Sequence, residues 1–388
     1  MTNYDNLQLL CLRLAHNFLV LLIGVVINST PSLAQGDALE EPSAPSKMAS
    51  HSLLLDIELV KSKLIAVGER GHILISNDQA GSWAQAQVPV RSTLTASFFS
   101  DEKNGWVVGH DGVVLRTNDG GLSWVKQLDG RLVNRLMYEH AKMLFDETEA
   151  VMITATDDQL KALELRLENL TTTIEDAESF IDEGPSRPFL DIWFKNSLEG
   201  FIVGAFGLFL HTQDGGESWT PWFDKLDLTD AFHLNVISRI GESLYIAGEA
   251  GLLYRSDDWG QSWNMLESPY EGPFFGAVEA GEHRVIVYGL RGNAFTSSDQ
   301  GNTWRAIETG TDASLFGGLR LDDGSVVLVG VGGTVLRLSD QGILKKRTQT
   351  TYKLPLSAVA QIDTKLVATG FGGIQPLVPD RKQQGVRP

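Results

Sequence analysis

The chain has 388 residues, of which 43% are hydrophobic, and its formal net charge is −17 at pH 7. A chain of this length and composition can bury a large core as one domain. The negative charge argues against a nucleic-acid surface, which needs clustered Lys and Arg. It favours a basic or neutral partner instead.

Residues 1–34 are typical of a secretory signal peptide. An apolar run over residues 18–27 precedes the small residues Ser32 and Ala34, which a signal peptidase inspects. The run is shorter than the ~20 apolar residues that span a bilayer comfortably, and an uncleaved anchor is the alternative. We expect secretion across the inner membrane into the periplasm, or into the equivalent thylakoid lumen. The mature protein then lacks the single cysteine, Cys11, and with it any disulfide or thiol catalysis.

Residues 35–50 are rich in Pro, Ser, Ala and Glu, which is typical of a flexible linker. From residue 51 one pattern recurs about every 40 residues: a glycine pair three apart, an apolar run, then Ser/Thr-x-Asp-x-Gly-x-Ser-Trp. Repeats of this length with several short strands are typical of a β-propeller. We therefore expect an all-β fold over residues 51–388, with seven four-stranded blades. The pairs begin at Gly68, Gly109, Gly204, Gly248, Gly289, Gly330 and Gly370.

The recurring residues are predicted to have structural roles and not catalytic ones. Each glycine pair brackets a tight turn between the second and third strands, where positive φ or a close backbone approach is expected. In the Ser/Thr-x-Asp-x-Gly-x-Ser-Trp pattern, known as the Asp-box or BNR repeat, the aspartate accepts backbone N–H bonds and the tryptophan packs between blades. This role is assigned to Asp78 and Trp83, Asp119 and Trp124, Asp214 and Trp219, Asp258 and Trp263, and Asp299 and Trp304.

The last unit lacks a clear outer strand. We predict that the ring closes by sharing a blade between the two termini. The segment just before His51, or the one after Ile374, would complete that blade.

Residues 131–183 interrupt the repeats between blades 2 and 3 and lack strand character. Apolar residues from Leu160 to Ile181 recur at spacings of three and four, which predicts a helix over about residues 157–181. An earlier helix over about residues 133–148 would pair with it as a helical hairpin. A long insertion on a rigid scaffold tends to carry function; an inserted spacer without a role is the alternative.

Connectivity predicts which face carries function. The insertion joins an outer strand to the next inner strand, so it lies on the face of the glycine-pair turns, and the Asp-boxes lie on the other face. The variable residues in the turns then surround the mouth of the central channel. We take them as candidate partner-binding residues: Glu69, Arg70, His110, Asp111, Phe206, Glu249, Arg291 and Phe371.

Patterns for catalysis and cofactors are missing from the sequence. Sialidases also carry Asp-boxes, but they need an arginine triad and a nucleophile pair. Arg116, Arg255 and Arg337 occupy one repeat position, which favours a structural role, and a sialidase-like glycan-active or glycan-binding propeller is the alternative function. The histidines lack metal-ligand spacing. We expect no catalytic residue, no metal and no cofactor.

The repeats Val67-Gly-x-x-Gly-x-Ile-Leu-x-Ser-x-Asp and Gly112-Val-Val-Leu-Arg-Thr-Asn-Asp-Gly-Gly-Leu-Ser-Trp124 resemble the photosystem II stability/assembly factor family. The likeness covers about residues 51–375 outside the insertion. It implies a lumenal or periplasmic seven-bladed propeller, a non-enzymatic chaperone that holds a reaction-centre subunit through an arginine-rich patch.

Within that resemblance, Arg70 and Arg291 match arginines in the glycine-pair turns, whereas other turns carry Glu, Asp or Phe. The resemblance implies a bacterial member. In a non-photosynthetic bacterium the implied partner is an envelope protein such as a transport complex. We expect a monomeric scaffold that binds protein and not nucleic acid.

Overall fold

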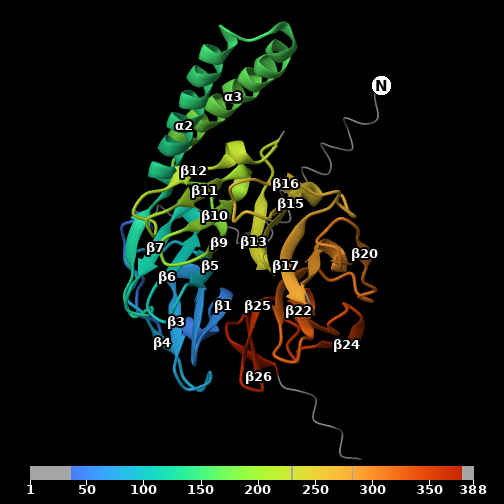
Figure 1. Ribbon diagram of the computed structural model, residues 1–388. Helices are drawn as coiled ribbons and strands as arrows, with labels where there is room; N and C mark the ends of the chain where they lie inside the picture. Colours follow the sequence, from blue (N-terminus) through green and yellow to red (C-terminus); the bar gives the residue numbers. More distant parts are fainter. Residues whose placement is uncertain (1–35, 229, 282, 378–388) are drawn as a thin grey trace, which may run out of the picture. The chain divides into compact units, whose positions relative to one another are not determined.

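The computed structural model describes residues 36–228, 230–281 and 283–377. The signal peptide predicted for residues 1–34 lies outside them. The chain divides into a unit that ends at Asp37 and a much larger unit that starts at Ala38. The larger unit contains seven antiparallel sheets and two long helices (Figure 1).

We number the sheets as blades 1–7 in chain order and give their strands from inner to outer. Blade 1 consists of β1 (Leu54–Val60), β2 (Lys63–Gly68), β3 (Ile73–Ser76) and β4 (Ala84–Gln85). Blade 2 consists of β5 (Leu94–Phe99), β6 (Gly105–Gly109), β7 (Val114–Thr117) and β8 (Val125–Leu128). Blade 3 consists of β9 (Phe189–Phe194), β10 (Gly200–Gly204), β11 (Phe209–Thr212) and β12 (Thr220–Pro221). Blade 4 consists of β13 (Leu234–Ile240), β14 (Ser243–Gly248), β15 (Leu253–Ser256) and β16 (Asn264–Met265).

The remaining blades follow the same order. Blade 5 consists of β17 (Phe274–Ala280), β18 (Arg284–Gly289), β19 (Ala294–Ser297) and β20 (Arg305–Ala306). Blade 6 consists of β21 (Leu315–Arg320), β22 (Val326–Gly330), β23 (Thr334–Leu338) and β24 (Leu344–Gln349). Blade 7 consists of β25 (Leu356–Ile362), β26 (Lys365–Gly370) and β27 (Gln375–Leu377). Short 3-10 turns are η1 (Ala49–His51), η2 (Glu69–Gly71), η3 (His110–Gly112), η4 (Ala205–Gly207), η5 (Phe223–Lys225), η6 (Glu249–Gly251), η7 (Leu290–Gly292) and η8 (Val331–Gly333).

The inner strands of the seven sheets form a ring. Each one lies beside the inner strand of the next sheet, and β25 lies beside β1, so the ring is closed. Apolar clusters fill the space between neighbouring sheets; one of them joins Val67 of blade 1 to Leu115 and Trp124 of blade 2. This arrangement is a β-propeller.

Blade 7 differs from the prediction. Among the described residues its sheet has three strands instead of four. The third strand, β27, follows Ile374. Among the described residues, the segment before His51 adds no strand to this sheet. That segment instead packs against the blade, with Ala49 in the same apolar cluster as Val367, and Ile374 N–H donates to the Ser50 carbonyl at 3.0 Å.

The aspartate turns hold their shape by local hydrogen bonds. Asp78 Oδ1 accepts from Ser76 Oγ at 2.9 Å and from Ser82 N–H at 2.8 Å, and its Oδ2 accepts from Ser82 Oγ at 2.6 Å. The bonds from Ser82, with that from Ser76, lower the pKa of Asp78 to about 2, because they favour the charged carboxylate. The same set of bonds recurs at Asp119, Asp214, Asp258 and Asp299.

The five tryptophans of these turns pack between blades. Trp219 lies in a cluster with Trp106 of blade 2 and Leu210 of blade 3. Trp83, Trp124, Trp263 and Trp304 contact similar clusters, each formed by strands of two neighbouring blades.

The two helices follow β8 and precede β9 in the chain. They are α2 (Gly130–Met152) and α3 (Asp157–Glu183), and they pack against each other as an arm, residues 130–183 (Figure 1). Helix α2 is longer at both ends than the predicted residues 133–148. Its start is earlier because Asp129 caps it, accepting from Arg131 N–H at 3.1 Å. No helix in the described part of the chain has the length and apolarity needed to cross a membrane.

Residues 38–50, which we expected to be part of a flexible linker, instead follow a defined path over the first blades; we call them the strap. Leu39 is 2% exposed and belongs to the core between blades 1 and 2. Ser43 N–H donates to the Val88 carbonyl at 3.0 Å, and Arg91 N–H donates to the Ala38 carbonyl at 2.8 Å. The strap therefore belongs to the folded ring.

Candidate partner-binding face

The glycine-pair turns are shaped by close backbone approaches. The first glycine of blade 1, Gly68, has an extended backbone, and a Cβ there would stand 2.7 Å from Leu54 Cα. The second and third residues after it turn the chain, with φ of 57° at Arg70 and 68° at Gly71. A Cβ on Gly71 would stand 3.1 Å from the carbonyl carbon of Val90, and closer still to its oxygen. Only glycine fits at both ends of the turn.

The second glycine forms a joint between blades. In blades 1, 4, 5 and 7 it lies against the carbonyl of the residue four positions before the next inner strand. These pairs are Gly71 with Val90, Gly251 with Tyr270, Gly292 with Thr311, and Gly373 with Ser50. The last pair shows that blade 7 meets blade 1 by the contact used elsewhere in the ring. Each of these four turns thus lies against the start of the neighbouring blade.

Three of the eight candidate residues are engaged locally. Glu69 accepts from Leu53 N–H at 3.2 Å, and Glu249 accepts from His233 N–H at 3.2 Å. Asp111 accepts from Ser92 Oγ at 2.6 Å. These carboxylates hold the segments that lead into the inner strands. They therefore have fewer free hydrogen-bond acceptors for a partner.

Four other candidates are less constrained. Arg70 and Arg291 are exposed, and their guanidinium groups form no hydrogen bond or ion pair with a described residue. Both stand at positive φ, 57° and 55°, so each projects from the tip of its turn. His110 and Phe371 are half-buried, and burial lowers the pKa of His110, which favours a neutral imidazole at pH 7.

Phe206 connects the turn of blade 3 to the arm. Its ring centroid lies 5.5 Å from that of Phe180 on α3 and 4.9 Å from that of His233. The Arg187 guanidinium lies over the Phe180 ring, 4.0 Å from its centroid. Arg187 also donates to Asn134 Oδ1 on α2 at 2.9 Å. A continuous set of contacts therefore runs from this turn into both helices.

The base of the arm is part of the core. Val133 and Met137 of α2 are buried in the cluster that contains Trp219. Asn134 Nδ2 donates to the carbonyl of Phe180 at the end of α3 at 2.6 Å, and His140 Nε2 lies 3.3 Å from Asp224 Oδ1 of the loop after blade 3. Buried packing and hydrogen bonds of this kind fix the direction in which the arm projects.

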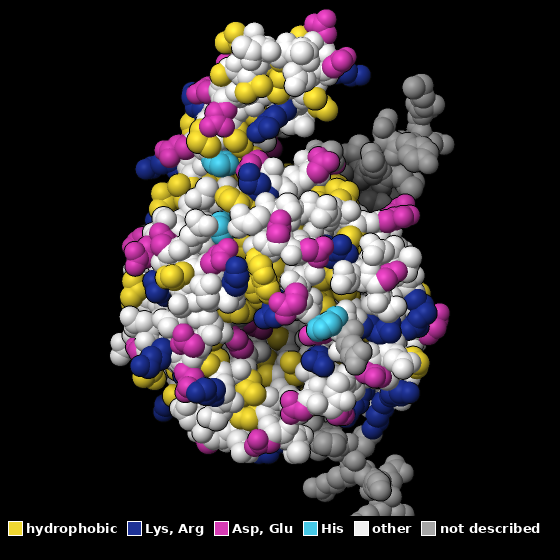
Figure 2. Space-filling model, viewed as in Figure 1, with side chains coloured by type: hydrophobic (Ala, Val, Ile, Leu, Met, Phe, Trp, Pro, Cys, Tyr) yellow, Lys and Arg dark blue, Asp and Glu magenta, His cyan; other side chains and the backbone are white. Residues whose placement is uncertain are grey.

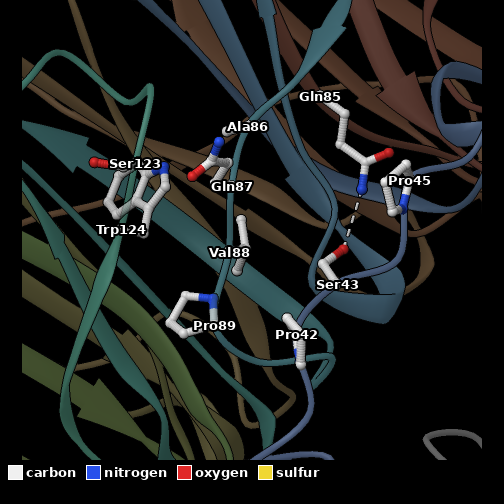
Figure 3. A pocket seen from close by; sticks show the side chains of 10 residues that line it. All are labelled: Pro42, Ser43, Pro45, Gln85, Ala86, Gln87, Val88, Pro89, Ser123 and Trp124. Carbon is white, nitrogen blue, oxygen red and sulfur yellow. Dashed lines mark hydrogen bonds between the residues drawn. The ribbon is translucent and has the colours of Figure 1, made fainter.

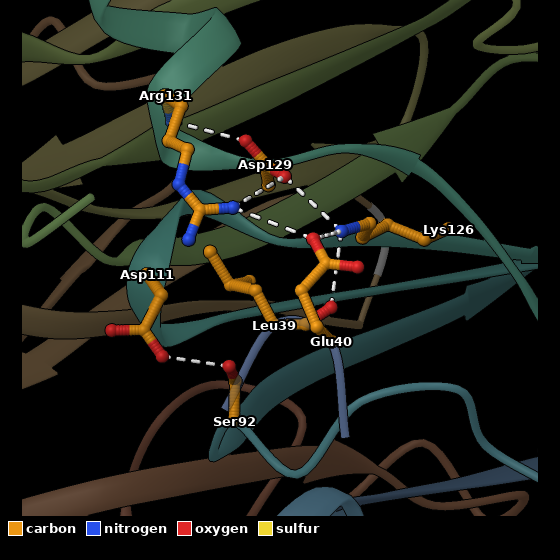
Figure 4. Close-up of polar contacts among 7 residues, drawn as sticks. All are labelled: Leu39, Glu40, Ser92, Asp111, Lys126, Asp129 and Arg131. Carbon is orange, nitrogen blue, oxygen red and sulfur yellow. Dashed lines mark hydrogen bonds and ion pairs between the residues drawn. The ribbon is translucent and has the colours of Figure 1, made fainter. Parts of the chain in front are cut away.

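The strap also reaches the arm. Lys126 donates to the Leu39 carbonyl at 3.0 Å and to Glu40 Oε1 at 2.9 Å, and Arg131 at the start of α2 lies 3.4 Å from the same carboxylate (Figure 4). Asp129 completes the cluster at 3.1 Å from Lys126. Further along, the strap edges an open hollow of about 470 Å³ over blades 1 and 2 (Figure 3). We expected none of these contacts.

Carboxylates near the propeller axis were also missed. Asp56 on β1 accepts from Ser97 of blade 2 at 2.8 Å, and Asp191 on β9 accepts from Ile237 N–H of blade 4 at 2.8 Å. Burial raises the pKa of Asp191 to about 7 and raises that of Asp56 and of Glu58 as well. These acids join adjacent inner strands. In the sequence they occupy alternate positions of a strand, where polar residues usually face solvent, so the pattern does not identify them as buried.

The arginines weighed for a sialidase site do not share one partner. Arg255 pairs with Asp257 at 2.9 Å, Arg337 pairs with Asp323, and Arg116 lies 4.0 Å from Glu217 and over the Trp106 ring. Each therefore binds a different carboxylate. No group of three His, Cys, Asp or Glu side chains placed to hold a metal ion is found among residues 36–377 that the structure describes.

Comparison with known families gives a match over most of the repeats. The family described as photosynthesis system II assembly factor YCF48 matches residues 75–156 and 180–347, more than half of the chain. A photosystem II assembly lipoprotein Ycf48 of Synechococcus sp. (strain CC9902) is 40% identical over 79 residues. That match spans 20% of this chain and 23% of the relative.

Solved structures with a similar fold include propellers of the same name. A structure of YCF48 bound to a D1 peptide has a TM-score of 0.57 and 14% identity, and covers 85% of this chain and 95% of that one. YCF48 from Cyanidioschyzon merolae gives 0.57 and 13%, with 85% and 96% covered. The WD40 β-propeller domain of Doa1 gives 0.57 and 11%, with 89% and 97% covered. At these identities the likeness establishes the fold.

Proposed function

The chain belongs to the photosynthesis system II assembly factor YCF48 family, and from this membership we propose that it is a non-enzymatic scaffold that binds a protein partner. A structure of one relative contains a bound D1 peptide, which supports a protein ligand for this chain. Neither the family match nor these relatives support the sialidase alternative.

The binding surface that we propose is the face of the glycine-pair turns together with the arm. The observation that carries this proposal is the contact of Phe206 with Phe180, 5.5 Å between ring centroids, because it ties a variable turn residue to the arm. The exposed Arg70 and Arg291 would supply charge on the same face. A rigid scaffold with a projecting element is a common way to position binding residues.

The arm favours a basic partner. Residues 130–183 carry 13 Asp and Glu against five Lys and Arg, so a large share of the negative charge of the chain lies there. Carboxylates and apolar side chains are interspersed on the face of the arm that Figure 2 shows, with fewer basic side chains between them. Complementary charge steers association and rejects wrong partners. We propose a subunit of a membrane or envelope complex as the partner, and a transport complex in a non-photosynthetic bacterium.

We also propose that the protein acts outside the cytoplasm, in the periplasm or the thylakoid lumen, as a monomer. The name of the Synechococcus relative, an assembly lipoprotein, supports a location at or beyond the membrane. Cell fractionation with N-terminal sequencing of the recovered protein checks the location. Sedimentation velocity checks the monomer.

The role of the arm is tested by excising it. A Cβ on Gly130 would stand 2.8 Å from Pro185 Cα, so the two ends of the arm meet and a Gly-Ser link can replace residues 131–183. Crosslinking and pull-down from the native envelope should recover the partner with the intact protein and lose it with the excised form. Equal recovery of the partner by both forms would show that the arm takes no part in binding.

The turn face is tested by charge reversal with a matched control. Arg70→Glu with Arg291→Glu should reduce recovery of the same partner. Lys61→Glu with Lys365→Glu changes the net charge equally at two exposed strand-end positions on the opposite face, and should leave recovery unchanged. An equal loss in both double variants would point to net charge rather than to this face.

A further inference from the structure

The outer strand of blade 6 is unusual for this chain. Strand β24 has six residues, whereas the outer strands of the other blades have two to four. Residues 343–354, which we call the basic flank, contain four Lys and Arg and no Asp or Glu, although the whole chain has 49 acidic and 32 basic residues. Lys and Arg side chains gather on this side of the molecule, over β20 and β24 (Figure 2). The four cations are Lys345, Lys346, Arg347 and Lys353.

These cations lie at the surface of the protein. All four are exposed, and β24 is the last strand of its sheet, so its outer edge is open. The ammonium groups of Lys345 and Lys353 form no hydrogen bond or ion pair with a described residue. Arg347 donates to the Gly310 carbonyl, which is neutral and leaves the positive charge in place.

Apolar side chains are exposed beside the cations. Ile343 is 47% exposed, Tyr352 80% and Leu354 38%. Lysine on an edge strand usually prevents sheet-to-sheet pairing, but that role does not require exposed Tyr and aliphatic groups beside it. Tyr with Lys and Arg is typical of surfaces that rest at a membrane interface. We propose that the basic flank docks the protein on an anionic lipid surface.

The negative charge of the rest of the chain sets a condition on this docking. At physiological ionic strength charges beyond about 8–10 Å are screened, so a lipid surface in contact with the flank meets mainly its cations. At very low ionic strength the screening length grows to ~30 Å, and the remaining carboxylates then repel the surface. Binding should therefore be strongest at intermediate salt and fall at both extremes.

This inference goes beyond the proposed function and does not depend on it. Blade 6 lies across the seven-membered ring from blades 2 and 3, between which the arm is inserted. Docking through the flank would leave the arm free for its protein partner.

Co-sedimentation with vesicles tests the proposal. The form that starts at residue 35 is suitable, because the ring from Ala38 onward has its own core. In 0.1 M NaCl it should pellet with vesicles of 70% phosphatidylcholine and 30% phosphatidylglycerol, and not with phosphatidylcholine alone. Lys345→Glu with Lys353→Glu should weaken binding by at least about 30-fold, because each cation near an anionic surface contributes ~1 kcal/mol and two cations are lost.

The matched control is Lys142→Glu with Lys161→Glu. It changes the net charge equally at exposed positions of the arm and should bind like the wild type. Tyr352→Ser, which leaves the charge unchanged, should weaken binding as well. Thermal melts check that every variant is folded.

Four results would overturn the proposal. They are an absence of binding, equal binding to both vesicle types, equal loss in the two double variants, and equal binding of all variants. A concentration-dependent dimer that Lys345→Glu with Lys353→Glu abolishes would assign the flank to a second copy of the chain instead.

Discussion

Replacing Gly373 by alanine tests the joint that closes the ring. Gly373 has φ of +79°, and a Cβ there would stand 2.6 Å from His51 Cα and closer still to the Ser50 carbonyl oxygen. Gly324 has the same φ, +79°, but nothing lies within 4 Å of its Cβ position. Gly324→Ala therefore measures the backbone cost alone, and the difference between the two variants measures the joint.

The expected magnitudes follow from these two contributions. A non-glycine residue in the left-handed region costs about 1–2 kcal/mol, which is the full expectation for Gly324→Ala. Overpacking adds about 1–3 kcal/mol, so Gly373→Ala should lose about 2–5 kcal/mol. For a ring of this size, ~2.1 cal/mol/K per residue makes each kcal/mol worth about 1.4 °C in Tm. We expect losses of about 1–3 °C for Gly324→Ala and about 3–7 °C for Gly373→Ala.

Differential scanning calorimetry measures both losses. Limited proteolysis adds a local measurement, because opening of the joint should expose the strap to cleavage in Gly373→Ala and not in Gly324→Ala. Equal melting temperatures and equal cleavage in the two variants would show that the Ser50 contact contributes nothing to closure, and that the reasoning about the joint is wrong.

Three further predictions follow from other contacts. Trp219→Ala should cost about 3–5 kcal/mol, measured by calorimetry, because its buried ring packs between blades 2 and 3; a loss below about 1 kcal/mol would contradict this packing. The pKa of Asp191, raised to about 7 from 3.8, gives stability that is complete below about pH 4 and is lost as the pH rises through about 7. Asp191→Asn should therefore reduce the Tm difference between pH 5 and pH 8, and an unchanged difference would refute the assignment. Arg187→Leu should speed hydrogen exchange at the base of α2 and α3 by about tenfold, since it removes a bond to Asn134 and the contact with Phe180; unchanged exchange would show that these contacts do not hold the arm.

Features set by short-range patterns could be predicted from the sequence. The aspartate turns need only partners within four residues, such as Thr212 and Ser218 around Asp214. The start of α3 could be predicted, because apolar residues recur at spacings of three and four from Leu160 onward. The start of α2 was missed, because Gly130 is a poor helix former and only the cap at Asp129 reveals it.

The strap could not be predicted in the same way. Its composition resembles a linker, and only two of its side chains, Leu39 and Ala49, are buried. Its other contacts join residues far apart along the chain, such as Ser43 N–H with the Val88 carbonyl and Glu40 with Lys126, and such contacts leave no local pattern in the sequence. The composition therefore predicted flexibility for a segment that the structure orders.

The candidate site was predictable in outline only. The glycine pairs identify the turns, but the partners that engage Glu69 and Glu249 lie 16 residues away along the chain. Asp111 bonds to Ser92 at a similar separation. Such separations carry no local periodicity, so the sequence could not distinguish the engaged carboxylates from the exposed Arg70 and Arg291.

The closure at Ser50 and Gly373 has a consequence for the order in which the protein folds. The two inner strands that meet there, β1 and β25, are made at opposite ends of synthesis, and contacts between distant parts of a chain form slowly. Until β25 and β26 are available, the apolar side of blade 1, with Leu54 and Leu64, has nothing to cover it. During most of its synthesis the growing chain therefore exposes the apolar side of blade 1, and exposed apolar surface of this kind promotes aggregation. Strands β25 and β26 end this exposure when they pack against blade 1.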